Sequence, residues 1–151
     1  MTAPPEFLAP MTGELLRLAV RGLSLPASPR VLDLCCGTGP ASLLLATEFG
    51  GVCTGVDLSE SLLRVGRERA LSLGITDRIE LRCGDARHLD LPNGTFDLAL
   101  ALGGALSYVG RPDGLERIRQ LLKPGGSLLL SDLVYLDSPA PESVVRILAE
   151  R

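Results

Sequence analysis

The chain has 151 residues and a formal net charge of −3, and 46% of its residues are hydrophobic. This length predicts one domain with a substantial core, and no apolar run approaches the roughly 20 residues that a membrane-spanning helix needs. Acidic and basic residues are interspersed, which disfavours generic electrostatic binding to nucleic acid. The first residues lack the basic and apolar regions of a secretory signal.

The pattern along the chain predicts an N-terminal helix followed by alternating strands and helices. The expected strands span residues 30–35, 52–57, 79–83, 96–102 and 127–133. The expected helices span residues 12–23, 40–49, 59–73, 112–122 and 141–151, and residues 124–126 are expected to form a turn. This alternation is typical of an α/β fold with an open, mainly parallel five-stranded sheet and helices on both faces.

A single domain is expected to contain three segments. Residues 1–29 form an N-terminal helical segment and linker, residues 30–134 form the α/β core, and residues 135–151 form a C-terminal helical segment. In the first segment Thr12 is a plausible N-cap, and Ser59 takes the same role later in the chain.

The four cysteines, Cys35, Cys36, Cys53 and Cys83, each lie in or beside an expected strand. Their spacing does not match the paired short spacers of zinc sites, so no metal is expected. We interpret them as small buried hydrophobic residues of a protein in the reducing cytoplasm.

Residues 31–42, VLDLCCGTGPAS, read as a buried strand that enters a helix through a turn at Gly37 and Gly39. Such a turn directs backbone N–H groups and the positive end of a helix at one place. In an open parallel sheet, ligands bind at the carboxyl ends of the strands. The sequence therefore predicts a ligand site around this turn.

Carboxylates occur in or just after three of the expected strands, at Asp33, Asp57 and Asp85. Carboxylates at buried strand ends cost free energy unless they are paired or solvated, so their repetition indicates function. Asp57 lies 20 residues after Gly37, the spacing of an acid that binds a ribose diol. The alternative is that Asp57 is a helix N-terminal acid, because it also precedes Ser59.

Asp33 distinguishes between classes of nucleoside cofactor. It precedes the glycine turn, where a carboxylate repels a pyrophosphate and attracts a cationic amino or sulfonium group. A dinucleotide fingerprint also has glycine where Ser42 stands. Both features disfavour the alternative of an NAD-dependent oxidoreductase.

With these residues in place, the sequence resembles the class I (Rossmann-like) S-adenosylmethionine-dependent methyltransferases of small-molecule type. The matching segments are VLDLCCGTG at 31–39, VDLS at 56–59, GDA at 84–86, FDLAL at 96–100 and LLKPGG at 121–126. Each motif alone is weakly specific, whereas all five in this order are strongly specific. The resemblance covers residues 30–134 and implies S-adenosylmethionine as the cofactor.

The resemblance implies roles for the residues around the glycine turn. Asp33 would hold the amino group of the methionine moiety, and Gly37 and Gly39 would let the backbone approach the methionine and ribose. Asp57 would bind the ribose hydroxyls. Cys35 stands where the family usually has glycine and could narrow the methionine pocket.

The resemblance also implies an adenine site and a path for the methyl group. Leu58 would pack on the adenine, Asp85 would accept from its exocyclic amine, and the Ala86 N–H would meet a ring nitrogen. Leu102 and Gly103 would line the path of the reactive methyl group.

No catalytic residue follows from the sequence, because methyl transfer from a sulfonium mainly requires orientation and a shaped, dry pocket. A base is needed only if the acceptor must lose a proton. His88 is interpreted as an exposed loop residue in preference to a general base. Tyr108 could belong to an acceptor pocket or equally to the packing of its loop.

The loop at residues 103–110, GGALSYVG, lacks the Asn/Asp-Pro-Pro-Tyr motif of nitrogen methylation on bases. The missing motif and the net negative charge together favour a small-molecule methyl acceptor. Neither nucleic acid nor a membrane is expected as a partner. The family usually has two further C-terminal strands, and their lack here suggests a truncated, split or minimal form. An open sheet edge would then favour a homo-oligomer. The main alternative is a cofactor-binding module without turnover of its own.

Overall fold

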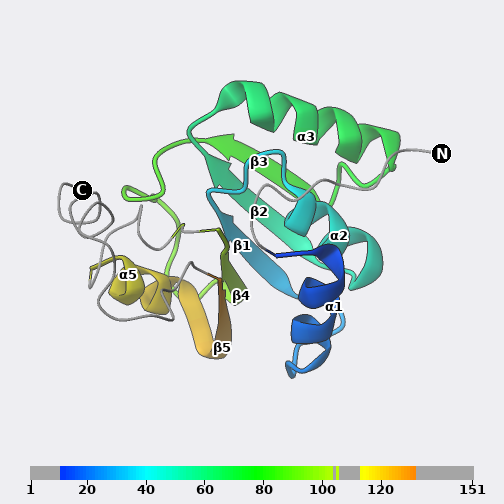
Figure 1. The fold of residues 1–151 in the computed structure, drawn as a ribbon. Coiled ribbons are helices and arrows are strands. Elements are labelled where there is room, and N and C mark those ends of the chain that lie inside the picture. The colour runs from blue at the N-terminus through cyan, green and yellow to red at the C-terminus, as the bar shows by residue number, and fades with distance from the viewer. Residues whose placement is uncertain (1–10, 104, 106–112, 132–151) are drawn as a thin grey trace, which may run out of the picture.

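The computed structural model describes residues 11–103, 105 and 113–131. Within them, five strands form one sheet in the order β3-β2-β1-β4-β5 (Figure 1), and all four pairings are parallel. The strands are β1 (Arg30–Leu34), β2 (Val52–Asp57), β3 (Ile79–Cys83), β4 (Phe96–Ala101) and β5 (Leu122–Leu130). The predicted α/β class and five-stranded parallel sheet are confirmed.

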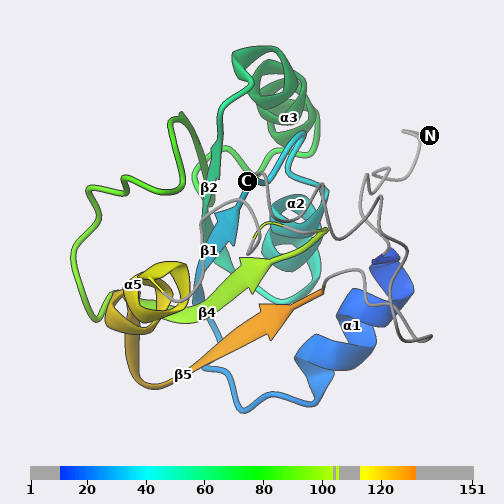
Figure 2. The same cartoon turned by 60° about the vertical axis from the view of Figure 1, so that its left-hand side comes forward.

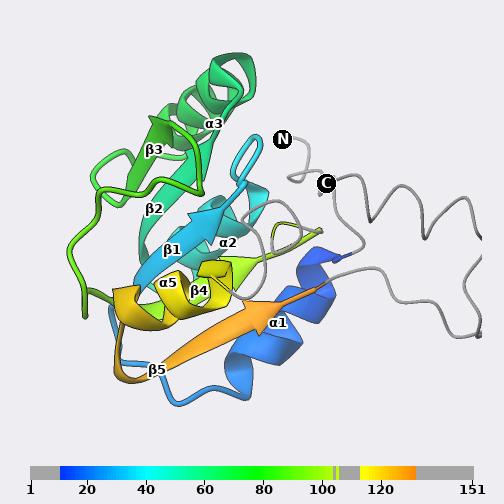
Figure 3. The ribbon, with the colours of Figure 1, turned by 90° about the vertical axis from the view of Figure 1, so that its left-hand side faces the viewer.

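Helices cover both faces of the sheet (Figures 2 and 3). The core under α1 (Gly13–Arg21) and α2 (Pro40–Glu48) includes Val31 of β1, whereas the core under α5 (Asp113–Leu121) includes Leu32 and Leu34. Successive β1 side chains therefore enter different cores, as the period of a strand requires. A third cluster joins α3 (Glu60–Ser72) to β3 through Leu63 and Leu81.

The helix starts follow local signals in the sequence. The hydroxyl of Thr12 accepts from the backbone N–H of Leu15 at 3.2 Å, and that of Ser59 accepts from the N–H of Leu62 at 3.4 Å. Both predicted N-caps are confirmed. In contrast, α2 begins after Gly39, which offers no side-chain cap, and it is buried from Pro40 to Ala46. A helix that is apolar on all sides in this way belongs to the interior of the fold.

The predicted turn at residues 124–126 lies inside β5 and not before it. Phe96 pairs with Leu122 and Leu98 pairs with Ser127, so β5 carries extra residues opposite β4. Gly125 has a φ of 79°, which lets the backbone bulge without a Cβ penalty. The strand therefore begins five residues earlier than the predicted 127.

Several expectations fall outside the described residues. These are the helix at 141–151, Tyr108, and the last two positions of the predicted strand 127–133. None of the helices in the described part of the chain is both long and apolar enough to cross a membrane.

Candidate cofactor site

A cleft of about 210 Å³ opens at the carboxyl ends of β1, β2 and β4. The chain order reverses at this point, because β1 lies between β2 and β4, and such a switch point is where open α/β sheets bind ligands. Five of the nine predicted site residues line it, whereas Gly39, Leu58, Asp85 and Ala86 do not. The lining comprises Asp33, Cys35, Cys36, Gly37, Thr38, Pro40, Ala41, Asp57, Leu62, Leu102 and Gly103.

Asp33 is a buried carboxylate, with 3% of its surface exposed. Its Oδ2 atom accepts a hydrogen bond of 2.7 Å from the hydroxyl of Ser42, in the first turn of α2. Burial raises the pKa of Asp33 to about 6, against the lowering effect of the hydrogen bonds from Ser42. Among the described residues no cationic side chain pairs with it, so the site offers an uncompensated acid to a cation.

Asp57 is fixed at the end of β2 by two backbone N–H groups. Gly37 donates to its Oδ2 at 2.7 Å, and Ser59 donates to its Oδ1 at 2.9 Å. Asp57 is therefore both an acid at the start of α3 and part of the cleft, so the two interpretations of this residue are compatible. Each oxygen retains a lone pair that can accept from a diol.

The turn between β1 and α2 consists largely of residues in the left-handed region. Cys35 has a φ of 55°, Gly37 of 58° and Gly39 of 68°. This conformation explains why β1 ends at Leu34, one residue before the predicted end, and it strains any residue with a Cβ. The cysteine at the family's glycine position is thus held in a glycine-type conformation.

The Cys35 thiol is protonated at neutral pH. Burial raises its pKa to about 11, and the negative charges of Asp57, Asp33 and Asp85 act in the same direction. A neutral thiol is a poor nucleophile, so we assign no covalent chemistry to Cys35.

Two glycines that the sequence analysis did not single out bring the surrounding elements close together. A Cβ at Gly66 of α3 would lie 2.7 Å from the carbonyl oxygen of Thr38, and one at Gly55 of β2 would lie 2.8 Å from the Sγ of Cys36. Only glycine permits α3 and β2 to approach the turn this closely. A glycine inside a helical pattern, as at position 66, was the available signal.

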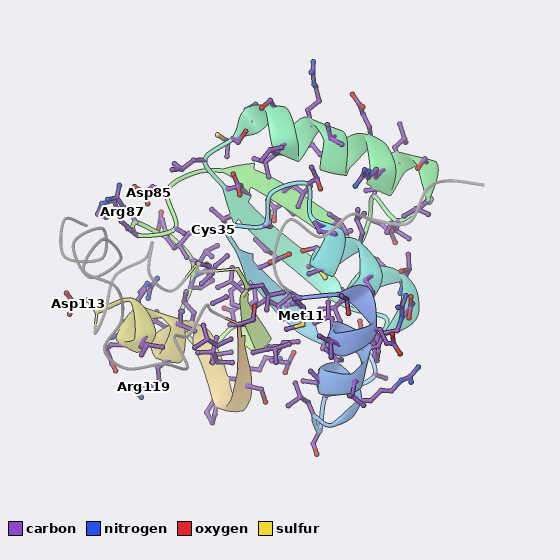
Figure 4. All side chains as sticks on the ribbon, in the orientation of Figure 1. Met11, Cys35, Asp85, Arg87, Asp113 and Arg119 are labelled. Carbon is purple, nitrogen blue, oxygen red and sulfur yellow. The ribbon has the colours of Figure 1, made fainter. Side chains whose placement is uncertain are left out.

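The predicted adenine residues lie beside the cleft. Asp85 follows β3 and forms an ion pair with Arg87, whose Nη2 atom lies 2.6 Å from its Oδ2 (Figure 4). Hydrogen bonds from the Arg87 side chain and backbone hold the pKa of Asp85 at about 2. Leu58 is 56% exposed, and Ala86 is buried in the core under α5.

The remaining predictions have mixed outcomes. His88 is an exposed loop residue, as predicted, and Cys36 and Cys53 are buried. The prediction that every cysteine is buried is wrong for Cys83, which is exposed at the end of an edge strand, and for Cys35, which is half-buried. The described residues hold no group of three or more His, Cys, Asp or Glu side chains that could bind a metal.

Residues 31–126 match the family model of a methyltransferase domain. The chain belongs to the class I S-adenosylmethionine-dependent methyltransferases. This assignment agrees with the fold and with the predicted family, and it decides against the oxidoreductase alternative.

Known members of the family show the extent of the likeness. The chain is 40% identical over 119 residues to a demethylmenaquinone methyltransferase of Listeria monocytogenes, covering 76% of this chain and 48% of that protein. It is 32% identical over 118 residues to the 27-O-demethylrifamycin SV methyltransferase of Amycolatopsis mediterranei, covering 78% and 43%. The chain thus spans about half the length of the curated relatives it matches.

A solved structure agrees with the fold over most of the chain. The methyltransferase from Thiobacillus denitrificans, in complex with S-adenosyl-L-homocysteine, superposes with a TM-score of 0.75 at 31% identity. The match covers 91% of this chain and 55% of that one.

Proposed function

We propose that this chain binds S-adenosylmethionine in the cleft and that the protein transfers the methyl group to a small-molecule acceptor. The observation that carries the proposal is that Asp33 and Asp57, from neighbouring strands, line one cleft around a left-handed glycine turn. One carboxylate suits an ammonium group and the other suits a ribose diol.

The donor set fits the methionine and ribose parts of the cofactor. Asp33 would bind the ammonium group, and the free lone pairs of Asp57 would accept from the two ribose hydroxyls. Gly37 leaves the backbone open to the ligand, Gly39 shapes the turn beside it, and Cys35 borders the methionine part. The remaining lining is mostly apolar, which matches the uncharged carbon skeleton between these groups.

The adenine would lie outside the 210 Å³ cleft, against Leu58, Asp85 and Ala86. The exposed side chain of Leu58 leaves an apolar face on which a base can pack. Asp85 already accepts from Arg87, so its bond to the adenine amine requires Arg87 to share the carboxylate or turn away. The backbone N–H of Ala86 would meet a ring nitrogen.

The cofactor supplies an activated methyl group when bound, and the chain's residues orient it and exclude water. Leu102 and Gly103 follow β4 and line the same cleft, so they would border the path of the methyl group. No catalytic base is assigned among the described residues, because in-line transfer requires one only for an acceptor that carries a proton.

The acceptor, partners and compartment are part of the proposal. Two curated relatives are named for demethylmenaquinone and 27-O-demethylrifamycin SV, which supports a small-molecule acceptor over nucleic acid. The four cysteines are free thiols, in keeping with the cytoplasm. Within the described sheet β3 and β5 are the edge strands, and pairing at an edge would give a homo-oligomer.

Isothermal titration calorimetry with S-adenosylhomocysteine at pH 7.5 tests the cofactor part, with NADH as the comparison ligand. We expect saturable binding of the first and none of the second. No heat at millimolar S-adenosylhomocysteine in a folded sample would overturn the proposal. Conversion of S-adenosylmethionine to S-adenosylhomocysteine with a small-molecule acceptor would exclude the alternative of a binding module without turnover.

A further inference from the structure

Ser42 is a buried residue of α2 with no exposed surface, and its hydroxyl donates to Asp33 from 2.7 Å. It is the third residue of the helix after the cap position at Gly39. At this position the backbone N–H of a helix normally donates a hydrogen bond to the side chain of the helix's own N-cap. Gly39 has no side chain, so α2 has no side-chain cap of its own, and the side-chain hydrogen bond in its first turn runs instead from the Ser42 hydroxyl to Asp33 of β1.

We propose that Ser42 is a positioning residue of the cofactor site, whose hydroxyl holds the Asp33 carboxylate ionised and fixed at the methionine end of the cleft. The inference rests on the proposed function and extends it to a residue that does not line the cleft. The hydroxyl of Ser42 reaches Asp33 from the first turn of α2, and the Ser42 backbone also favours the charged form of this carboxylate. The positive end of the helix favours the same charged form.

The surroundings of Asp33 otherwise oppose its charge. The negative charge of Asp57 of β2 repels it. Three thiols adjoin it, and burial raises the pKa of each above the usual range, so they remain neutral; these are Cys35, Cys36 and Cys53. On the packed side, α2 contributes no titratable side chain before Glu48. Within the part of the chain that the structure describes, Ser42 is therefore the residue whose side chain stabilises the Asp33 carboxylate.

A carboxylate oxygen accepts more than one hydrogen bond, so Asp33 can bind Ser42 and a ligand ammonium together. Removing the hydroxyl should shift Asp33 toward its protonated form, which has no charge to offer an ammonium. The loss should be greatest at and below the pKa of Asp33 and should fade at higher pH, where Asp33 is ionised in both proteins. A purely structural role would weaken binding equally at every pH.

The test compares wild type with Ser42→Ala by calorimetry, using S-adenosylhomocysteine and adenosine between pH 6 and 8.5. We expect about tenfold weaker binding of S-adenosylhomocysteine at pH 6.5 and less than about twofold at pH 8.5. Adenosine, which has no ammonium, should bind both proteins alike. In the Asp33→Asn background, Ser42→Ala should have no further effect on this pH profile.

A carbon-13 NMR titration of the Asp33 carboxyl measures the same effect without a ligand, and Ser42→Ala should raise its pKa. If Ser42→Ala does not fold, Ser42→Cys keeps nearly the same volume with a weaker donor and should shift the pKa in the same direction. An unchanged pKa and pH profile overturn the role of Ser42 while leaving wild-type binding intact. A wild type that does not bind S-adenosylhomocysteine overturns the proposed function itself, and this inference with it.

Discussion

The backbone N–H of Gly37 donates to the Oδ2 of Asp57 at 2.7 Å and so ties the glycine turn after β1 to the end of β2. The residues are 20 positions apart in the chain, yet one hydrogen bond fixes both parts of the proposed site. Ser59 holds the other oxygen of Asp57 at 2.9 Å. The carboxylate is therefore oriented before any ligand arrives, which lowers the entropy cost of binding.

Replacing Asp57 by Ala should weaken S-adenosylhomocysteine binding by about 1.5–3 kcal/mol, the usual loss for hydrogen bonds to a charged group. Chain stability should fall as well, because the N–H groups of Gly37 and Ser59 lose their acceptor. Calorimetry measures the first effect and thermal denaturation the second. Asp77→Ala is the matched control, since Asp77 is an exposed acid far from the cleft lining; equal affinity of the two variants would refute the ribose assignment.

Asp33→Asn should stabilise the ligand-free chain at pH 7.5 while weakening its binding of S-adenosylhomocysteine. The folded-state pKa of Asp33, about 6, lies above the usual 3.8, so the folded chain loses stability as pH rises through this interval. At neutral pH the ionised Asp33 lowers the free energy of unfolding by about 2–3 kcal/mol. Chemical denaturation measures the free energy of unfolding of both proteins. The excess of Asp33→Asn over wild type should shrink by this amount between pH 7.5 and pH 4.

Asp97 serves as a control for Asp33, because its pKa is shifted in the opposite direction. Burial tends to raise its pKa, but the Lys123 ammonium and the Arg30 N–H outweigh this and hold the pKa below its usual value. Asp97→Asn should therefore destabilise the chain at neutral pH, and this loss should decrease as pH falls. Parallel pH trends for the Asp33 and Asp97 variants would contradict the assigned cause.

Cys35→Val should destabilise the chain by about 2 kcal/mol or more, because a β-branched residue is strongly disfavoured at a φ of 55°. Cys35→Gly should stay within about 1 kcal/mol of wild type, since relief of strain offsets the greater freedom of the unfolded chain. Cys83→Val in β3 is the control and should be nearly neutral, as its exposed strand position suits valine. Urea denaturation distinguishes the three.

Gly66→Ala should cost about 1–3 kcal/mol by overpacking. The new Cβ would lie 2.6 Å from Leu81 Cδ1 and 2.7 Å from the backbone oxygen of Thr38. Because Thr38 lines the cleft, cofactor binding should weaken together with stability. Gly84→Ala is the matched glycine control, with only an ordinary 3.8 Å contact to Val56, and a similar loss for both variants would disprove the close-approach argument.

The features that the sequence by itself determined are those encoded by neighbouring residues. Short apolar runs predicted the five strands, Thr12 and Ser59 predicted two helix starts, and the glycines predicted the turn at the end of β1. The acids at the strand ends could be predicted as a group because parallel strands bring their carboxyl ends to one edge.

Only the tertiary structure decided the features that depend on pairing and packing between distant segments. The β5 bulge arises from its register against β4, and the exposure of Cys83 arises from its place at the end of an edge strand. Ser42 meets Asp33 only because α2 packs with that side of its first turn on β1. A local pattern carries no information on these contacts, since each is set by the geometry of two elements that meet only in the folded chain.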